Sequence, residues 1–171
     1  MRAVTFDEET AVLGFLEAME KGLSSKVVGT STLGVVERDH IQFAVLASPA
    51  AASLPAALLE GATAVGLPIG VLEDGEFHLD VQGAILVALH PKAQTIRVTE
   101  QAARLFLYGR NILGDSVLWH DHGLSRGDAC IVCNARGEAL GLGSVVGSFK
   151  GPREAVHPVQ DLGTYLRDQD E

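Results

Sequence analysis

Hydrophobic and polar positions recur with two different periods in the first part of this 171-residue chain. Apolar side chains follow the capping-box pattern Thr5-Phe6-Asp7-Glu8 at helical spacing, which predicts a helix over residues 6–21 with Gly22 as its stop. Two runs rich in β-branched residues, 33–36 and 41–47, are separated by Glu-Arg-Asp-His. They predict a pair of strands joined by a turn.

The pattern continues with helix and strand signals up to residue 92. Residues 50–59 are rich in alanine and leucine and precede Gly61, which predicts a helix that tolerates Pro55 only in its first turn. Runs at 65–72 and 76–80 flank Glu73-Asp74-Gly75 and predict a hairpin, because glycine accepts the positive φ of tight turns. We interpret residues 81–88 as a helix rather than a strand, and His90-Pro91-Lys92 ends it.

A different pattern begins after that break. Residues 95–98 predict a strand, and residues 99–107 predict a helix with Thr99 as its N-cap. Short apolar runs between glycine-containing turns follow, as in a small β-barrel, and residues 159–167 close the chain. The sequence therefore predicts an α+β protein with two domains, residues 1–92 and 93–171.

Composition narrows the class of protein. Hydrophobic residues make up 47% and charged residues 20% of the chain, which predicts a folded core rather than disorder. No apolar run has the length of a membrane span, and Asp7, Glu8 and Glu9 interrupt the N-terminus, so we expect neither a membrane anchor nor a signal peptide. Two cysteines without an export signal indicate a reducing compartment. We therefore expect a cytoplasmic protein.

The charge is unevenly distributed. The net charge of −9 opposes binding to nucleic acid. Residues 1–94 hold 5 Lys/Arg and 12 Asp/Glu, a net of −7, whereas residues 95–171 hold 8 and 10, a net of −2. Within the second half, residues 97–113 hold three arginines against one glutamate, and 142–153 hold two cations and no acid. These two stretches are candidate RNA contacts, with ordinary solvated surface as the alternative.

Five side chains in these stretches suit RNA. Arg104 and Arg110 flank a glycine, and Lys150 and Arg153 lie in a glycine-containing loop where cations can reach phosphates. Tyr108 could stack on an unpaired base. Its helical spacing from neighbouring apolar residues favours a place in the core instead.

Other chemistry has less support. His120, His122, Cys130 and Cys133 are zinc-type ligands, but cysteines three apart in a strand point to opposite faces. We therefore expect ordinary strand cysteines, with no metal and no cofactor. The chain has no Walker loop and no nucleophile elbow, and its Gly-Leu-Gly lacks a third glycine. We expect no enzyme activity.

Several segments together resemble a known module: 1–10, 103–109 through 115–117, 126–132, 139–143 and 161–167. Those in the second half are similar to the PUA domain, a small RNA-binding module, and the full order of segments resembles the ribosome-biogenesis PUA-protein family. In that family a pre-PUA α+β domain precedes a C-terminal PUA pseudo-barrel; eukaryotic members act in large-subunit assembly, and archaea carry a homologue.

The resemblance implies a non-enzymatic RNA-binding assembly factor in large-subunit assembly or rRNA processing. Its expected partners are single-stranded regions of an rRNA precursor and ribosome-assembly proteins. It is expected to be a monomer and to bind no membrane. One alternative is a protein–protein adaptor with a degraded RNA surface, and another is a zinc protein that uses the histidines and cysteines named above. The RNA contacts that the resemblance implies are the basic residues Arg104, Arg110, Lys150 and Arg153, and Tyr108 is the candidate for stacking on a base.

Overall fold

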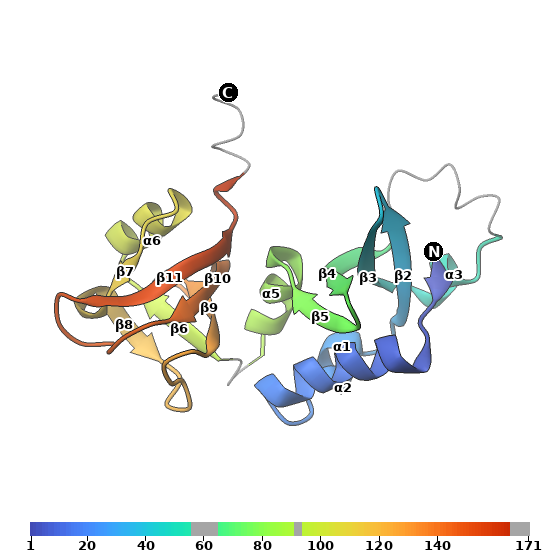
Figure 1. The fold of residues 1–171 in the computed structure, drawn as a ribbon, viewed down its shortest axis with the longest axis horizontal. Coiled ribbons are helices and arrows are strands. Elements are labelled where there is room, and N and C mark those ends of the chain that lie inside the picture. Colours follow the sequence, from blue (N-terminus) through green and yellow to red (C-terminus); the bar gives the residue numbers. More distant parts are fainter. Residues whose placement is uncertain (56–64, 91–93, 165–171) are drawn as a thin grey trace. The chain divides into compact units, whose positions relative to one another are not determined.

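The computed structural model describes residues 1–55, 65–90 and 94–164. The chain forms two compact units, Met1–Gly83 and Ala84–Glu171 (Figure 1). The predicted domain boundary after residue 92 falls outside the described residues and stays a prediction, and so does the end of the predicted closing segment at 165–167. Among the described residues, no helix is both long enough and apolar enough to cross a membrane.

The N-terminal unit is built on an antiparallel sheet with the order β1-β2-β3-β4-β5 (Figure 1). The strands lie in the sheet in their order along the chain, and helical segments lie between β1 and β2 and between β3 and β4. The predicted strands at 33–36, 41–47, 65–72 and 76–80 are confirmed with small shifts at their ends. The five strands are β1 (Arg2–Ala3), β2 (Thr32–Arg38), β3 (Ile41–Ala47), β4 (Leu67–Glu73) and β5 (Glu76–Leu79).

Two tight turns set the register of this sheet. Asp39 and His40 have φ of 50° and 67°, and Asp74 and Gly75 have φ of 51° and 83°. Two successive residues with positive φ make the type of two-residue turn whose twist matches a β-hairpin. The predicted Asp74-Gly75 hairpin is confirmed. The first turn uses only the last two residues of the predicted Glu-Arg-Asp-His segment, because β2 extends to Arg38.

Helices flank the sheet of this unit. The predicted helix 6–21 is α1 (Phe6–Met19), which buries Val12 and Leu16 and is followed by α2 (Leu23–Val28). The predicted helix 81–88 is α5 (Val81–Ala88), where the Asp80 carboxylate accepts the Gly83 N–H at 2.7 Å. Residues 84–88 belong to the second compact unit.

The predicted helix over residues 50–59 is corrected in part. The structure has a short helix α3 (Pro49–Ala52), and residues 53–55 are not helical. The proline of its first turn is Pro49, preceded by the N-cap Ser48, and not Pro55. A serine cap followed by proline starts the helix at residue 49, one residue before the start of the predicted segment. Residues 56–59 lie outside the described residues.

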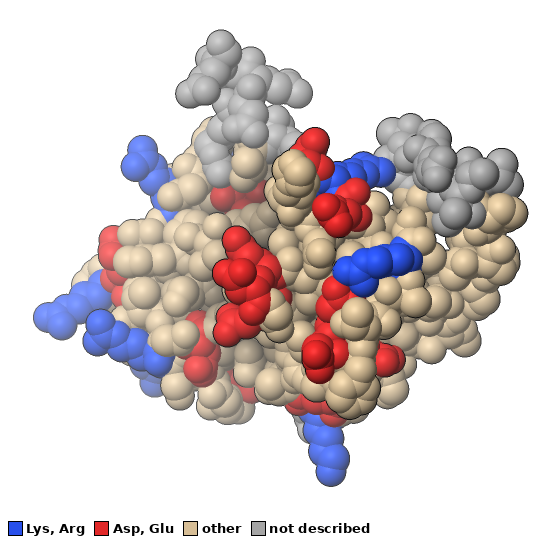
Figure 2. All heavy atoms as spheres, turned by 45° about the vertical axis from the view of Figure 1, so that its right-hand side comes forward, with Lys and Arg blue, Asp and Glu red and all other residues tan. Residues whose placement is uncertain are grey.

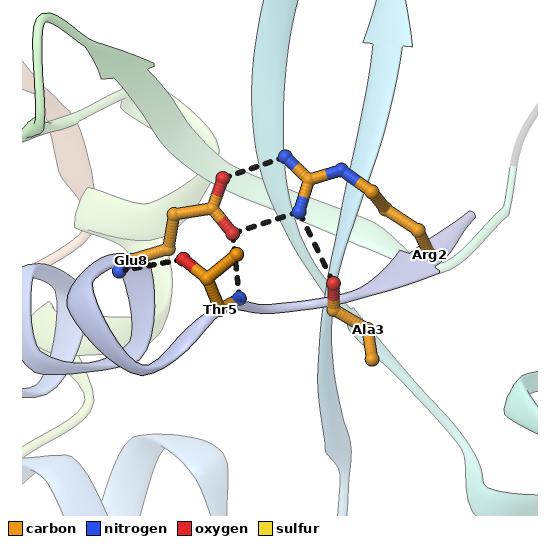
Figure 3. A network of polar contacts seen from close by, with 4 residues as sticks. All are labelled: Arg2, Ala3, Thr5 and Glu8. Carbon is orange, nitrogen blue, oxygen red and sulfur yellow. Dashed lines mark hydrogen bonds and ion pairs between the residues drawn. The ribbon is translucent and has the colours of Figure 1, made fainter.

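The predicted capping box starts α1 (Figure 3). The Thr5 hydroxyl accepts the Glu8 N–H at 3.3 Å, and the Glu8 carboxylate accepts the Thr5 N–H at 2.7 Å. Arg2 on β1 donates to both oxygens of the same carboxylate, at 2.6 and 2.8 Å. These contacts lower the pKa of Glu8 to about 2, with the hydrogen bond from Arg2 as the main cause. One side chain therefore joins the first strand to the first helix.

The C-terminal unit contains a curled six-stranded sheet with the order β7-β11-β10-β9-β6-β8 (Figure 1). Only the β6–β9 pair among these is parallel. The α+β class and the predicted small barrel-like half are confirmed, including the strand at 95–98. The strands are β6 (Thr95–Val98), β7 (Ile112–Leu113), β8 (Val117–His120), β9 (Ala129–Cys133), β10 (Ala139–Val145) and β11 (Glu154–Asp161).

One helix packs on the core of this sheet. α6 (Glu100–Leu107) begins at the predicted N-cap Thr99, whose hydroxyl accepts the Ala102 N–H at 3.2 Å. Phe106 of α6 is fully buried among side chains from five strands, and burying such a ring stabilises the fold by about 1.5–3 kcal/mol. The fully buried members of this core are Ile96, Val98, Phe106, Cys130, Val132, Ala155 and Val156.

We expect the Arg2–Glu8 pair to make the stability of the N-terminal unit depend on pH. The charged Glu8 stabilises the folded state above the ordinary pKa of 4.5, and this contribution is lost as the pH falls through about 2. Glu8→Gln keeps a capping amide but loses the charge. Urea unfolding near pH 6 should show the wild type more stable by about 0.5 kcal/mol, as for exposed ion pairs. The difference should shrink toward pH 2; a difference independent of pH would contradict this role.

Candidate nucleic-acid interface

The end of α6 presents three of the five predicted contact residues. Arg104 lies in the last turn and is exposed, and Tyr108 is 67% exposed at the C-cap. The Gly109 N–H donates to the Phe106 carbonyl at 2.8 Å, and the Arg110 N–H donates to the Leu105 carbonyl at 3.0 Å. This pair of bonds, with φ of 73° at Gly109, is a Schellman motif. It turns the chain so that Arg110 leaves the helix end as an exposed residue.

The interpretation of Tyr108 as core is wrong. Of the three apolar residues near the helix end, only Phe106 is buried, whereas Leu105 is 46% and Tyr108 is 67% exposed. The helix stops at Leu107, so helical spacing no longer sets the direction of the next side chain. Tyr108 is therefore available for stacking on a base.

Lys150 and Arg153 lie on the loop between β10 and β11, residues 146–153, which is held against the 3₁₀ turn η1 (Gly114–Ser116). The Gly114 N–H donates to the Arg153 carbonyl, and the Asp115 N–H donates to the Gly151 carbonyl, both at 2.9 Å. Both cationic side chains are exposed. The loop is therefore attached to the chain only a few residues beyond Arg110.

Two further residues hold this loop in place. A Cβ atom on Gly114 would stand 2.4 Å from the Ser148 carbonyl oxygen and 2.7 Å from the Lys150 nitrogen, so only glycine permits the approach. On the other side, the Phe149 ring stacks on His120 of β8 with ring centroids 4.3 Å apart. The sequence contained the glycine and the aromatic residue, but no local pattern relates Gly114 to Ser148 or Phe149 to His120.

The cations of this unit are not neutralised by neighbours. In the N-terminal unit, Arg2 and Lys26 form ion pairs with glutamates. Across 94–164, by contrast, no Lys or Arg lies within ion-pair distance of a carboxylate in the described structure. The unpaired cations are Arg97, Arg104, Arg110, Arg126, Arg136, Lys150 and Arg153.

The acid beside Arg153 in the sequence is engaged elsewhere. The Glu154 carboxylate accepts the Asn111 amide at 2.8 Å and contacts the His157 ring at 2.9 Å. These hydrogen bonds, that from Asn111 first, lower the pKa of Glu154. Glu154 is therefore a carboxylate at neutral pH, and its hydrogen bonds join the start of β7 to β11 rather than cancelling the charge of Arg153.

Figure 2 shows both signs of charge at the surface, since Lys and Arg side chains are exposed and so are Asp and Glu side chains. Such a surface attracts polyanions weakly at long range, because opposite charges within a Debye length offset one another. Binding would then depend on short-range contacts of individual cations.

The structure does not assemble the zinc ligands. Cys130 and Cys133 are buried at 0% and 2% exposure, and His120 is engaged with Phe149 and with the His122 ring. Among the described residues, no three His, Cys, Asp or Glu side chains gather at a spacing that could hold a metal ion. The zinc alternative therefore lacks its site. The prediction that both cysteines are strand residues is confirmed by their place in β9.

Comparison with known proteins relates the C-terminal part of the chain to a family. Residues 94–170 match the family model described as UPF0113 PUA domain. A UPF0113 protein from Aeropyrum pernix is 38% identical over 72 residues, which cover 42% of this chain and 37% of that protein. PUA domains are generally RNA-binding.

Solved structures share the fold of the whole chain. A conserved PUA domain protein from Thermoplasma acidophilum superimposes with a TM-score of 0.66 at 13% identity, covering 98% of this chain and 97% of that one. A hypothetical protein from Pyrococcus horikoshii gives 0.65 at 15% identity, covering 91% and 89%. At such identities the similarity establishes the fold alone.

All five predicted RNA contacts of the C-terminal unit are exposed. Arg104, Tyr108 and Arg110 lie along one segment, and Lys150 and Arg153 lie on the loop docked against the continuation of that segment. Their role in RNA binding stays a prediction. The contribution of Gly114 and Phe149 to the arrangement became apparent only in the structure.

We expect Gly114→Ala to disturb the loop of residues 146–153, which carries Lys150 and Arg153, without changing any charge. The added methyl group collides with the Ser148 and Lys150 backbone, and such overpacking costs about 1–3 kcal/mol. Thermal unfolding should show a lowered midpoint, and RNA affinity should fall with it. Gly123→Ala is the matched control, since its Cβ would meet only the Asp121 carboxylate, 3.7 Å away. Equal unfolding midpoints for Gly114→Ala and Gly123→Ala would contradict the close approach of Gly114 to the loop.

The two cysteines should be inert in the folded protein. Burial is the main cause that raises the pKa of Cys130 to about 12 and of Cys133 to about 11, so neither is a thiolate at neutral pH. A chromogenic thiol reagent at pH 8 should react with both only after unfolding in urea. Rapid reaction in native buffer would show that β9 is more accessible than the structure indicates.

Proposed function

We propose that this protein is a non-enzymatic RNA-binding assembly factor whose PUA domain holds single-stranded regions of an rRNA precursor during assembly of the large ribosomal subunit. The observation that supports it best is the group of exposed, unpaired cations at the end of α6 and on the docked loop. The family-level RNA binding of PUA domains supports the same reading. A monomer in the cytoplasm is part of this proposal.

The chemistry expected at this surface follows from the side chains. Arg104, Arg110, Lys150 and Arg153 would contact phosphates, which supply affinity that falls as salt rises. Tyr108, 67% exposed beside two of these arginines, would stack on an unpaired base. Because stacking on a single ring is tolerant of sequence, selection of one RNA requires a larger surface or a partner protein.

The acidic N-terminal half favours a second role as a protein-binding unit. Residues 1–94 carry a net charge of −7, and both Arg2 and Lys26 are already paired with glutamates. Such a surface repels RNA and suits basic ribosome-assembly proteins. If the RNA surface is degraded, this half would make the chain a protein–protein adaptor.

Changing Arg104, Arg110, Lys150 and Arg153 together to Ala should weaken RNA binding strongly. Each lost contact with single-stranded RNA reduces the slope of log affinity against log salt by about 0.7, so the four together should reduce it by roughly 3. Fluorescence anisotropy of a labelled single-stranded RNA at several salt concentrations measures both affinity and slope.

The single variant Arg126→Ala is the control for the single variant Arg104→Ala, since each removes one exposed, unpaired cation from the PUA domain. The proposal expects a larger loss at Arg104 than at Arg126. Equal binding by the wild type and the fourfold variant would reject these contact residues. Absence of binding in low salt would reject the RNA function and leave the adaptor, which would retain assembly proteins after nuclease treatment.

A further inference from the structure

A second candidate contact lies on the outer face of the β6–β8 pair. Arg97 of β6 and Trp119 of β8 are partners across the strands, and the guanidinium carbon lies 5.6 Å from the centre of the indole ring. The flanking residues Ile96 and Val98 are fully buried, so Arg97 points away from the core, and it is exposed. Trp119 is 44% exposed. The domain thus presents an arginine on an aromatic ring at its sheet edge.

The backbone of the β9–β10 hairpin supports the other side of this arginine. A Cβ on Gly137 would stand 3.5 to 3.6 Å from three guanidinium atoms, Nη2, Cζ and Nε. Because the three distances are nearly equal, the guanidinium plane lies flat over this position. Asn134 fixes the hairpin, since its side-chain oxygen accepts the N–H groups of Arg136 and Glu138 at 3.0 Å. The Arg97 guanidinium therefore lies near both the Trp119 ring and this hairpin.

The hydrogen-bonding groups of Arg97 are nevertheless free. Within the described parts of the chain, its guanidinium makes no hydrogen bond and no ion pair. The hairpin carboxylate Glu138 accepts the amide of Asn134 at 2.5 Å instead. A guanidinium has five N–H donors and no acceptor, so a ligand that supplies acceptor oxygens would find donors already in position.

We propose that Arg97 and Trp119 form a second RNA contact on the PUA domain, in which Trp119 stacks on an unpaired base and Arg97 donates to a phosphate or to a base acceptor. An exposed indole and an oriented planar cation match the two parts of a nucleotide. This inference rests on the proposed RNA-binding function and extends it. The chain runs from Arg110 through η1 into β8, which allows one RNA strand to follow both sites.

Trp119 is the only tryptophan of the chain, so its fluorescence reports on this site alone. Titration of the full-length wild type with unlabelled single-stranded RNA should quench its emission to a plateau at the concentrations where anisotropy shows binding. An oligonucleotide backbone without bases should bind through phosphate yet leave the emission nearly unchanged. Equal quenching by the base-free backbone or by an acidic peptide would overturn the stacking contact.

Two variants test the pair. Trp119→Ala should weaken RNA binding roughly tenfold, because one base loses its stacking partner. Arg97→Gln should weaken RNA binding and reduce the quenching of Trp119 fluorescence by RNA. Leu118→Ala is the matched control: Leu118 is 59% exposed on the same strand, and neighbouring side chains of a strand point to opposite faces. Circular dichroism checks that each variant is folded. If Trp119→Ala does not fold, the second contact is tested by comparing the RNA-induced quenching of Trp119 fluorescence in the wild type and in Arg97→Gln.

The outcomes separate this inference from the function on which it rests. RNA binding by anisotropy without any change in Trp119 emission, together with unaltered affinity of Arg97→Gln, would overturn the second contact and leave the first intact. Absence of RNA binding in low salt would overturn both. Quenching that follows binding and is lost in Arg97→Gln would support the second contact.

Discussion

The close approach of the Gly114 backbone to the loop at Ser148–Lys150 is the contact on which the candidate RNA surface depends. Two backbone hydrogen bonds, from Gly114 to Arg153 and from Asp115 to Gly151, hold the loop there, and the stack of Phe149 on His120 holds its other side. Without these contacts, Lys150 and Arg153 would lie on a loop independent of α6. With them, the backbone of the loop that carries Lys150 and Arg153 is held against η1, which begins four residues after Arg110.

The net charge of this protein opposes RNA binding, whereas the local charge at its exposed arginines and lysine favours it. The chain has a net charge of −9, yet the arginines and the lysine of the described residues 94–164 form no ion pairs. At physiological ionic strength charges are screened beyond roughly 8 Å, so a phosphate near Arg104 or Arg153 responds mainly to those side chains. Such a surface gives contacts without strong long-range attraction. In the proposed complex, stacking of Tyr108 and Trp119 on bases would add affinity that does not come from phosphate contacts.

The sequence predicted features that depend on neighbouring residues. The Thr5 capping box, the Thr99 cap and the Asp74-Gly75 turn each involve residues at most four positions apart, where side-chain chemistry decides the backbone. The resemblance to a PUA domain ordered the elements of the second half correctly. The start of α3 was misplaced because Ser48-Pro49 decides it, not the alanine-rich run that follows.

Patterns of neighbouring residues do not predict contacts between segments that are distant in the sequence. Periodicity shows that Arg97 lies in a strand, but only the strand pairing places it against Trp119 and the hairpin at Gly137. Tyr108 was assigned to the core because helical spacing was continued one residue past the end of the helix. The five predicted RNA contacts were located by charge and resemblance, and the structure shows them exposed without testing their role.

The proposed binding of RNA at the end of α6 and at the loop of residues 146–153 is tested most directly by nuclear magnetic resonance. Amide chemical shifts of the isotope-labelled full-length protein are recorded while single-stranded RNA is added. We expect the largest shifts at residues 104–115 and 148–154, with saturation at the concentration where the RNA is bound. Shifts confined to residues 1–83, or no shifts in low salt, would contradict it.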